Sequence, residues 1–572
     1  MKISSSLVSK ILLAVAIIVL IGTAYSMNRD YQDTWILEGL EIPFFLFVLT
    51  FAFAFYVEKS ILRRVTLAVL GRTVFMLIPA VKYVWFIEPY IDQNVQNALA
   101  NYVVANGHIM TSPSVSQVYS DSPLIHLSFA MFSSFLNIPV ASSMKYVPVF
   151  WSMLFPLLIY IIVKNMDFPT KSTMLGCALF ISAIPISIPQ YVVSGSLFGM
   201  LLLQFILTIL VLIFVRSNRY FWPILLFSVI ALSAAHSVTS ILFTGFLLIL
   251  LFLKKFSRLG LSSFLSSAKV LILVLIGLAW FSFQAYGALQ SIVQVFSVEI
   301  PTGTTAVSQH IGTGSFTVLR INPIAALMSF GVVYAADVFF LLLSFVGLLL
   351  ILRMRKRLNP VSRFFAILYS IVLVLGVVGA ILTVGAPRLL FVAQLLFPIF
   401  SSIFICSLLS KKTSIRKLIV GVVFFLIILL ATIEFYGCQP IIPSANVLDK
   451  DLPSSVKLNY VFMVNSIYQR QMIIFAEKYV SGVVAAVFPI TNQIIGLTNS
   501  NFSLNVRSYD PLDSNLSKPY YDFLLINAPG SAGNYAGNPN PLLNDPILMN
   551  NYISNQTIIY TNGESYVLVN SP

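Results

Sequence analysis

Charged residues are scarce in this sequence. Asp, Glu, Lys and Arg make up 9% of the 572 residues, whereas 58% are hydrophobic. Soluble domains carry about 25% charged residues, so the composition excludes an ordinary water-soluble protein. Apolar runs of about 20 residues, the length needed to cross a bilayer, recur along the chain, for example at 8–26, 42–57, 363–384 and 417–436. The composition predicts an all-α polytopic membrane protein.

Cysteine and histidine are rare as well. Of the three cysteines, Cys177 and Cys406 lie in predicted spans and Cys438 has no evident partner. They therefore indicate neither a disulfide framework nor a cysteine metal site. The four histidines lack the spacing of three or four residues that a helical zinc site uses. All four fall in segments predicted to be external, and for most of them the simpler interpretation is an interfacial polar residue: His108, His126, His236 and His310. The last three are also cavity-lining candidates. His236, in "AAHSVTS" between two apolar runs, is expected to mark a tight external turn or a cavity wall.

The net charge of +14 is explained by the predicted membrane topology. Lys and Arg occur in short clusters between apolar runs, not on one soluble face, which disfavours nucleic acid as a partner. With a cytoplasmic amino terminus, about thirteen spans put every basic cluster inside and the carboxyl terminus outside. We therefore expect a multi-pass cell-membrane protein. The first apolar run is read as a span, and a cleaved signal stays open because Lys2 and Lys10 precede it and Ala24 precedes a polar exit.

Three parts are expected: a transmembrane hairpin at 1–65, a membrane body at 66–436 and an external domain at 437–572. The last part has no spanning run. It contains a helix-like stretch at 469–480 and strand-like runs such as "VVAAVFPI", "YDFLLINAP" and "QTIIYTNGE". Asn562-Gly563 is a strong hairpin signal. A small α/β domain is predicted.

Three N-glycosylation sequons begin at Asn501, Asn515 and Asn555. All three lie in the domain that the charge pattern places outside, where such sequons are used. Tripeptides of this kind also arise by chance in Asn-rich sequence. The three sequons are consistent with an external C-terminal domain and do not prove that it is glycosylated.

The longest early external loop, 87–144, holds the main functional signal. Apolar residues at helical spacing, with Asp92, Gln96 and Asn97 among the other positions, predict an amphipathic helix at the membrane surface. A second apolar segment, Tyr119–Pro139, is short for a span. We expect it to lie at the interface or to dip into the bundle.

Asp92 is the leading candidate for a functional carboxylate. The alternative is an exposed loop acid or a helix N-cap. Glu88 precedes it by four residues, and Asp121 can approach it if the two loop helices pack together. Close carboxylates either bind a divalent cation or raise one another's pKa for base chemistry. The sequence leaves open whether these three meet.

Two arginines lie apart from the cytoplasmic clusters, at predicted external helix ends. Arg388 and Arg320 are suited to hold the phosphate of a lipid carrier. Alternatively, they snorkel to lipid headgroups. Asp337 lies inside an apolar run, where an ionisable group is costly and is therefore paired or functional.

The order of these features resembles the GT-C glycosyltransferases, which include protein O-mannosyltransferases, aminoarabinose transferases and the catalytic subunits of oligosaccharyltransferase. The matching features are Asp92, "NALANYVVANGHI", Tyr119 with "SPLIHL", Arg388 in "GAPR", and an external C-terminal domain. The closing "IIYTNGESYVLV" is similar to archaeal members. The resemblance covers about 66–572 and rests on order and topology.

The resemblance implies transfer of a sugar, with inversion, from a polyprenyl-phosphate donor to a glycan, lipid or protein acceptor. Asp92 would be the base, and Arg388 with Arg320 would bind the donor phosphate. Two departures matter. The next external loop has Gln190 and Tyr191 but no carboxylate, which disfavours a tightly held metal while leaving a divalent cation open. The tail lacks WWDYG, which disfavours transfer of a whole oligosaccharide to Asn. The hairpin at 1–65 is an addition to the family pattern.

Two other classes of function remain as alternatives. A lipid or sugar transporter or flippase predicts paired charges or broken helices near mid-membrane and an internal repeat. Asp337 is the one clear deep charge, and no convincing repeat is present. A non-catalytic membrane assembly protein uses neither Asp92 nor Arg388. No feature of the sequence names the sugar or the acceptor.

Overall fold

The structure is a computed structural model. It describes the backbone of residues 5–29, 38–82, 91–109, 122–166, 168, 171–185, 195–216, 220–254, 267–283, 323–354, 359–381, 392–409, 419–427, 429–430, 467–481, 484–486, 506–508, 522–527, 557–561 and 565–569.

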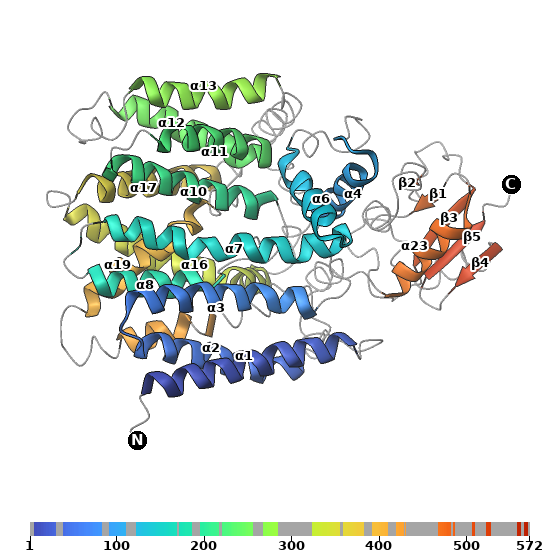
Figure 1. Cartoon of the computed structure of the whole chain (residues 1–572), viewed down its shortest axis with the longest axis horizontal. Coiled ribbons are helices and arrows are strands. Elements are labelled where there is room, and N and C mark those ends of the chain that lie inside the picture. Colours follow the sequence, from blue (N-terminus) through green and yellow to red (C-terminus); the bar gives the residue numbers. More distant parts are fainter. Residues whose placement is uncertain are drawn as a thin grey trace.

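Long apolar helices lie side by side in a bundle (Figure 1). Most are apolar on every side, as expected of helices buried among other helices or in lipid. In chain order they are α1 (Ser5–Arg29), α2 (Glu38–Val57), α3 (Ile61–Lys82), α7 (Val140–Asn165), α8 (Lys171–Ala183), α10 (Gly195–Arg216), α11 (Phe221–Ala235), α12 (Ser237–Lys254), α13 (Ser267–Phe283), α16 (Pro323–Arg353), α17 (Pro360–Ile381) and α19 (Phe397–Leu409).

Three helices in the described part of the chain are long and apolar enough to cross a membrane. Their spanning windows are Ser142–Asn165, Leu197–Arg216 and Ala336–Arg353. Nine apolar helices with shorter described stretches, of 10–17 residues, accompany them. The fold is therefore mostly helical and apolar, while the number of spans and the sidedness of the termini stay predictions.

The hairpin of α1 and α2 packs against α3 through aromatic rings. Phe51 of α2 meets the edge of Phe75 in α3 and stacks on Phe180 of α8, with ring centroids 6.3 Å and 5.8 Å away. Gly71 of α3 allows this approach, because a Cβ there would overlap the Phe51 ring. The hairpin is thus docked on the body by packing and not only by its connection to α3.

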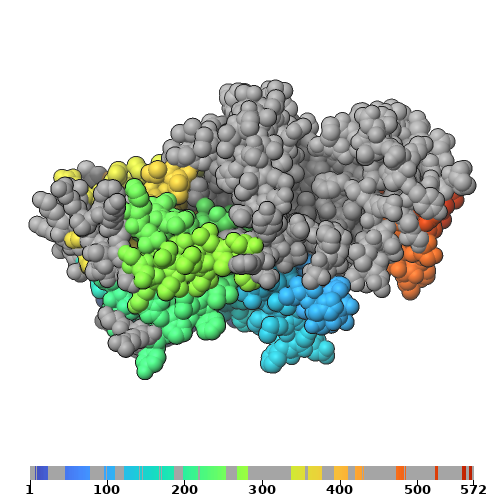
Figure 2. All heavy atoms as spheres, turned by 90° about the horizontal axis from the view of Figure 1, so that it is seen from above, coloured from blue at the N-terminus to red at the C-terminus, as the bar shows by residue number. Residues whose placement is uncertain are grey.

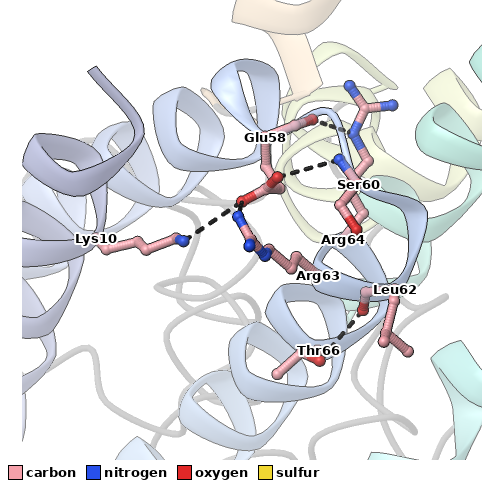
Figure 3. A network of polar contacts seen from close by, with 7 residues as sticks. All are labelled: Lys10, Glu58, Ser60, Leu62, Arg63, Arg64 and Thr66. Carbon is pink, nitrogen blue, oxygen red and sulfur yellow. Dashed lines mark hydrogen bonds and ion pairs between the residues drawn. The ribbon is translucent and has the colours of Figure 1, made fainter. Parts of the chain in front are cut away.

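A polar network closes the hairpin at the end that carries the amino terminus (Figure 3). The Glu58 carboxylate, between α2 and α3, lies 3.5 Å from Lys10 Nζ in α1 and 3.7 Å from Arg63 Nη1 in α3. It also accepts the Ser60 N–H at 3.0 Å. Burial by itself raises the pKa of this carboxyl, but the Ser60 bond together with Arg63 and Lys10 holds the pKa below its ordinary value.

Two further helices, α4 (Ile91–Asn106) and α6 (Leu124–Leu136), lie between the bundle and the C-terminal sheet (Figure 1). Figure 2 shows the blue to cyan residues that include them as a lobe beside the green bundle helices. α6 ends at Asn137, whose left-handed backbone (φ 52°) lets the Ile138 N–H reach Ser133 O at 3.1 Å, a common helix terminus. Pro139 is the N-cap of α7, which begins at Val140. The predicted loop helices are confirmed, and α6 has only 13 residues.

The C-terminal part contains a five-stranded sheet in the order β2-β1-β3-β5-β4. The strands are β1 (Val484–Ala486), β2 (Val506–Ser508), β3 (Phe523–Asn527), β4 (Thr557–Thr561) and β5 (Ser565–Val569). β1 pairs in parallel with β2 and β3, whereas β5 runs antiparallel to β3 and β4. Helix α23 (Ile467–Tyr479) packs on the sheet, and Phe475 stacks on Tyr560 with ring centroids 4.4 Å apart.

Candidate functional site

Asp92 is the second residue of α4, and the structure describes its backbone. Its helix packs on α6 and, to a smaller extent, on α7. The helix therefore lies across the end of the bundle that faces the C-terminal sheet (Figure 1). The other sequence-predicted residues of the loops lie outside the described residues: Glu88, Tyr119, Asp121, Gln190, Tyr191, His310, Arg320 and Arg388.

The polar face of α4 is partly buried, unlike the surface helix that the sequence predicted. Gln96 and Asn97 are 2% and 3% exposed, whereas the apolar Val104 is 45% exposed. Asn97 accepts a hydrogen bond from the Asn101 side chain at 3.2 Å. The amphipathic spacing was correct, but the amide side of the helix meets protein because α6 covers it.

His126, near the start of α6, is completely buried. Its Nδ1 lies 3.4 Å from Gln96 Oε1, a long hydrogen bond that the Nδ1–H tautomer donates. Its Nε2 has no hydrogen-bond partner in the part of the chain that the structure describes. Burial lowers the pKa of His126 to about 4, so the imidazole is neutral at physiological pH. It is a core histidine facing α4, and not a solvent-exposed base.

His236 occupies the break between α11 and α12, as the sequence predicted for a tight turn. Its backbone is extended (φ −154°, ψ 100°), and its Nδ1 lies 2.6 Å from Thr239 Oγ1 in the first turn of α12. Gly199 of α10 packs closely here, since a Cβ would lie 2.8 Å from the His236 Cβ. The neighbouring Ser237 Oγ is 2.8 Å from Ser122 Oγ, and both serines are buried. This contact joins the start of α6 to the α11–α12 break.

An aromatic stack fixes α6 on the bundle. Trp151 of α7 lies between Phe129 of α6 and Phe198 of α10, with centroid distances of 5.7 Å and 4.1 Å. Ser143 of α7 also donates to the Phe129 carbonyl at 2.9 Å. Stacked rings of this kind add to the energy of apolar burial. α6 is therefore a rigid support on which α4 rests.

Asp337 lies in α16, remote in sequence from the loop helices. It is 2% exposed and accepts a hydrogen bond from Gln394 Nε2 at 2.8 Å. The same helix carries Ser344, whose hydroxyl contacts the Tyr369 hydroxyl of α17. The buried carboxylate is thus paired with a neutral amide. No Lys or Arg side chain forms a salt bridge with it in the part of the chain that the structure describes.

An apolar pocket lies among α10, α12, α17 and the turn that precedes α19. All its lining residues are hydrophobic, and its cavity volume is about 30 Å³. The pocket does not by itself identify a lipid site.

A metal site receives no support from the described residues. They contain no group of three or more His, Cys, Asp or Glu side chains placed to hold an ion. The Asp92 side chain, Glu88 and Asp121 lie outside that set. Whether these carboxylates share a divalent cation stays a question from the sequence.

No protein-family model matches the chain, and no curated protein matches it either. The apo crystal structure of the Archaeoglobus fulgidus oligosaccharyltransferase is similar in fold, with a TM-score of 0.50, 12% identity, and coverage of 83% of this chain and 70% of that one. The likeness shows a shared fold and no particular activity.

Two further structures from Archaeoglobus fulgidus match with a TM-score of 0.47. The oligosaccharyltransferase AglB in complex with an inhibitory peptide and a dolichol-phosphate is 11% identical, with coverage of 77% of this chain and 64% of that one. The oligosaccharyltransferase in complex with Zn and sulfate is 10% identical, with coverage of 77% and 62%. The chain thus spans somewhat less than two thirds of the length of these two.

The sequence did not predict the roles of three residues that make polar contacts at this end of the bundle. Gln96 was assigned to a polar helix face, and its burial against His126 has no local signal. Ser122 and Ser237 are 115 residues apart, and serines of this kind are common in apolar helices and their ends. The two histidines of this region were singled out, His126 as a cavity-lining candidate and His236 by its position between two apolar runs.

Proposed function

We propose that this chain is a membrane glycosyltransferase that moves a sugar from a polyprenyl-phosphate donor to an acceptor. The observation that carries the proposal is the position of α4: the helix with Asp92 lies across the bundle end, between the apolar body and the C-terminal sheet (Figure 1). A base there is within reach of a lipid-borne donor and a water-borne acceptor. The GT-C-like fold supports this assignment.

The proposed reaction is an inverting displacement at the anomeric carbon. Asp92 takes the proton of the acceptor hydroxyl, whose oxygen attacks the anomeric carbon from the face opposite the phosphate. The bond between that carbon and the phosphate oxygen breaks, and the polyprenyl phosphate leaves with the electron pair. Arg388, with Arg320, binds the phosphate and stabilises the charge that develops there. Both roles come from the sequence and stay proposals.

The rival transporter assignment is not favoured by Asp337. That assignment expects a deep charge that faces alternating half-channels. Asp337 is instead 2% exposed and hydrogen-bonded to Gln394. A buried carboxylate held by an amide is suited to joining two helices, so we keep transfer as the proposed function.

A reconstituted transfer assay tests the proposal. The purified full-length chain, in liposomes, is given synthetic polyprenyl-phosphate sugars, the matching polyprenyl-pyrophosphate sugars and nucleotide sugars. We expect glycosylated acceptor to form only with the first donor, together with free polyprenyl phosphate, and NMR of the product to show the inverted anomer. Movement of intact donor between leaflets without cleavage would support the transporter class instead.

A further inference from the structure

The start of α6 makes two buried polar contacts to two different parts of the protein. Ser122, just before the helix, contacts Ser237 at 2.8 Å. His126, one turn later, contacts Gln96 at 3.4 Å. A segment of five residues therefore joins α4 on one side and the α11–α12 break on the other. All four side chains are at most 6% exposed.

The rest of α6 is fixed independently. Phe129 stacks on Trp151, and Ser133 Oγ donates to the Ile138 carbonyl at 2.6 Å, which closes the far end of the helix. α4 has less support, since it packs mainly on α6. The orientation of α4 therefore depends on its contact with α6, and the polar part of that contact is Gln96 with His126.

Two of the three candidate acids lie close in the chain to residues of these contacts. Asp92 precedes Gln96 by one helical turn in α4, and Asp121 is the residue before Ser122. Fixing Gln96 fixes the first turn of α4, where Asp92 is attached. Small misplacements of a reacting group are costly, because an error of 1 Å can lower a rate roughly 100-fold.

We infer that Ser122 and His126 form a positioning node, which fixes the helix that carries Asp92 against the α11–α12 break. The node needs no titration of His126 and no ligand. Its catalytic consequence rests on the proposed function, whereas its effect on the order of α4 does not. These are positioning residues, because they act through α4 and do not touch the reacting atoms.

The node is tested by a double-mutant cycle with two readouts on the full-length protein. His126→Leu leaves the buried Gln96 amide without the imidazole, and Gln96→Leu leaves the buried imidazole without the amide. The double variant places two apolar side chains in contact instead. The first readout is hydrogen exchange of the α4 backbone amides, which needs no activity assay. We expect roughly tenfold faster exchange in each single variant and recovery in the double variant.

The second readout is the turnover of folded, monodisperse protein. We expect kcat to fall roughly 10- to 100-fold in each single variant, with an unchanged KM for the donor and rescue by His126→Gln, which keeps an N–H donor. A role in folding alone would lower the yield without changing kcat per folded molecule. The matched control is Ser133→Ala, which removes a buried hydrogen bond from the other end of α6 and leaves kcat within about twofold.

Ser122→Ala and Ser237→Ala provide an independent cycle with smaller changes, in case His126→Leu does not fold. Both should speed exchange in α4 and the first turn of α12. Unchanged exchange in α4 in all these variants would overturn the node. If the wild type transfers no sugar, the proposed function fails, while the exchange data still decide whether the node exists.

Discussion

Gln394 donates a hydrogen bond from Nε2 to the Asp337 carboxylate at 2.8 Å, inside the apolar bundle. The contact joins α16 to the helical residues 392–394, which precede α19. α16 also approaches α19 itself closely, where Gly347 meets the Phe400 backbone. Six residues before Gln394 comes Arg388, the proposed phosphate ligand. The pair thus anchors the chain that follows this arginine.

The pair predicts different results for two substitutions of Asp337. Asp337→Leu leaves the Gln394 amide without its acceptor, which should lower the free energy of unfolding by about 1–3 kcal/mol. Asp337→Asn keeps an oxygen acceptor and should retain stability and transfer activity. Melting in detergent and a transfer assay measure both. Loss of transfer activity in well-folded Asp337→Asn would show that transfer needs the charge of Asp337 and not only its hydrogen bond.

The Glu58 network at the other end of the bundle predicts unequal effects of its members (Figure 3). The Lys10 side chain is 42% exposed, so Lys10→Ala should cost less than about 1 kcal/mol. The Glu58 side chain is 6% exposed and also accepts the Ser60 N–H at the start of α3. Glu58→Ala should therefore cost more, about 1–3 kcal/mol, and speed hydrogen exchange in α1. Equal melting temperatures for the two variants would contradict this order.

Acidification should destabilise the wild type through His126. Its pKa is about 4 in the fold and about 6.5 in an unfolded chain, so the unfolded state binds the proton more tightly. The contribution is fully present above pH 6.5 and is lost as the pH falls towards 4, by about 3 kcal/mol in all. Melting at pH 7.5 and pH 5.0 measures the loss, and His126→Gln should show a smaller one. An equal loss in His126→Gln would refute this assignment.

The proposed phosphate ligand Arg388 predicts an effect on donor binding. Arg388→Ala should raise the KM for the polyprenyl-phosphate sugar roughly 10- to 100-fold, because it removes one or two charge-assisted hydrogen bonds to the donor phosphate. Arg388→Lys should recover only part of the donor affinity, so its KM should lie between those of the wild type and Arg388→Ala. The reason is that lysine cannot bind phosphate bidentately. Arg353→Ala, at the exposed far end of α16, is the matched control. A KM that Arg388→Ala leaves at the wild-type value would remove Arg388 from the site.

Much of the fold could be predicted because its signals are local. Asn562-Gly563 between alternating runs predicted the antiparallel β4–β5 pair, and the helical spacing after Ile91 predicted α4; both are confirmed. The β2 strand, Val506–Ser508, was not predicted. It has three residues in a polar stretch and forms by pairing in parallel with β1, which no local pattern specifies.

The site was less predictable because its contacts join distant segments. Hydrophobic spacing separates the polar and apolar sides of α4, but it does not say which side another helix covers. Gln96 meets His126 across 30 residues, and Ser122 meets Ser237 across 115. Such pairs depend on how the helices pack, so the sequence predicted the helix that carries Asp92 and not the contacts that fix it.

The central claim is that Asp92 is the base of a sugar transfer, and release of polyprenyl phosphate tests it most directly. Wild type, Asp92→Asn and a control variant are compared in liposomes with the same polyprenyl-phosphate sugar and acceptor. The control is Asp522→Asn, which changes the residue directly before β3. We predict a loss of roughly 100- to 10,000-fold in Asp92→Asn, the usual contribution of a general base, with donor binding and Asp522→Asn unchanged. Full release by well-folded Asp92→Asn would contradict the account.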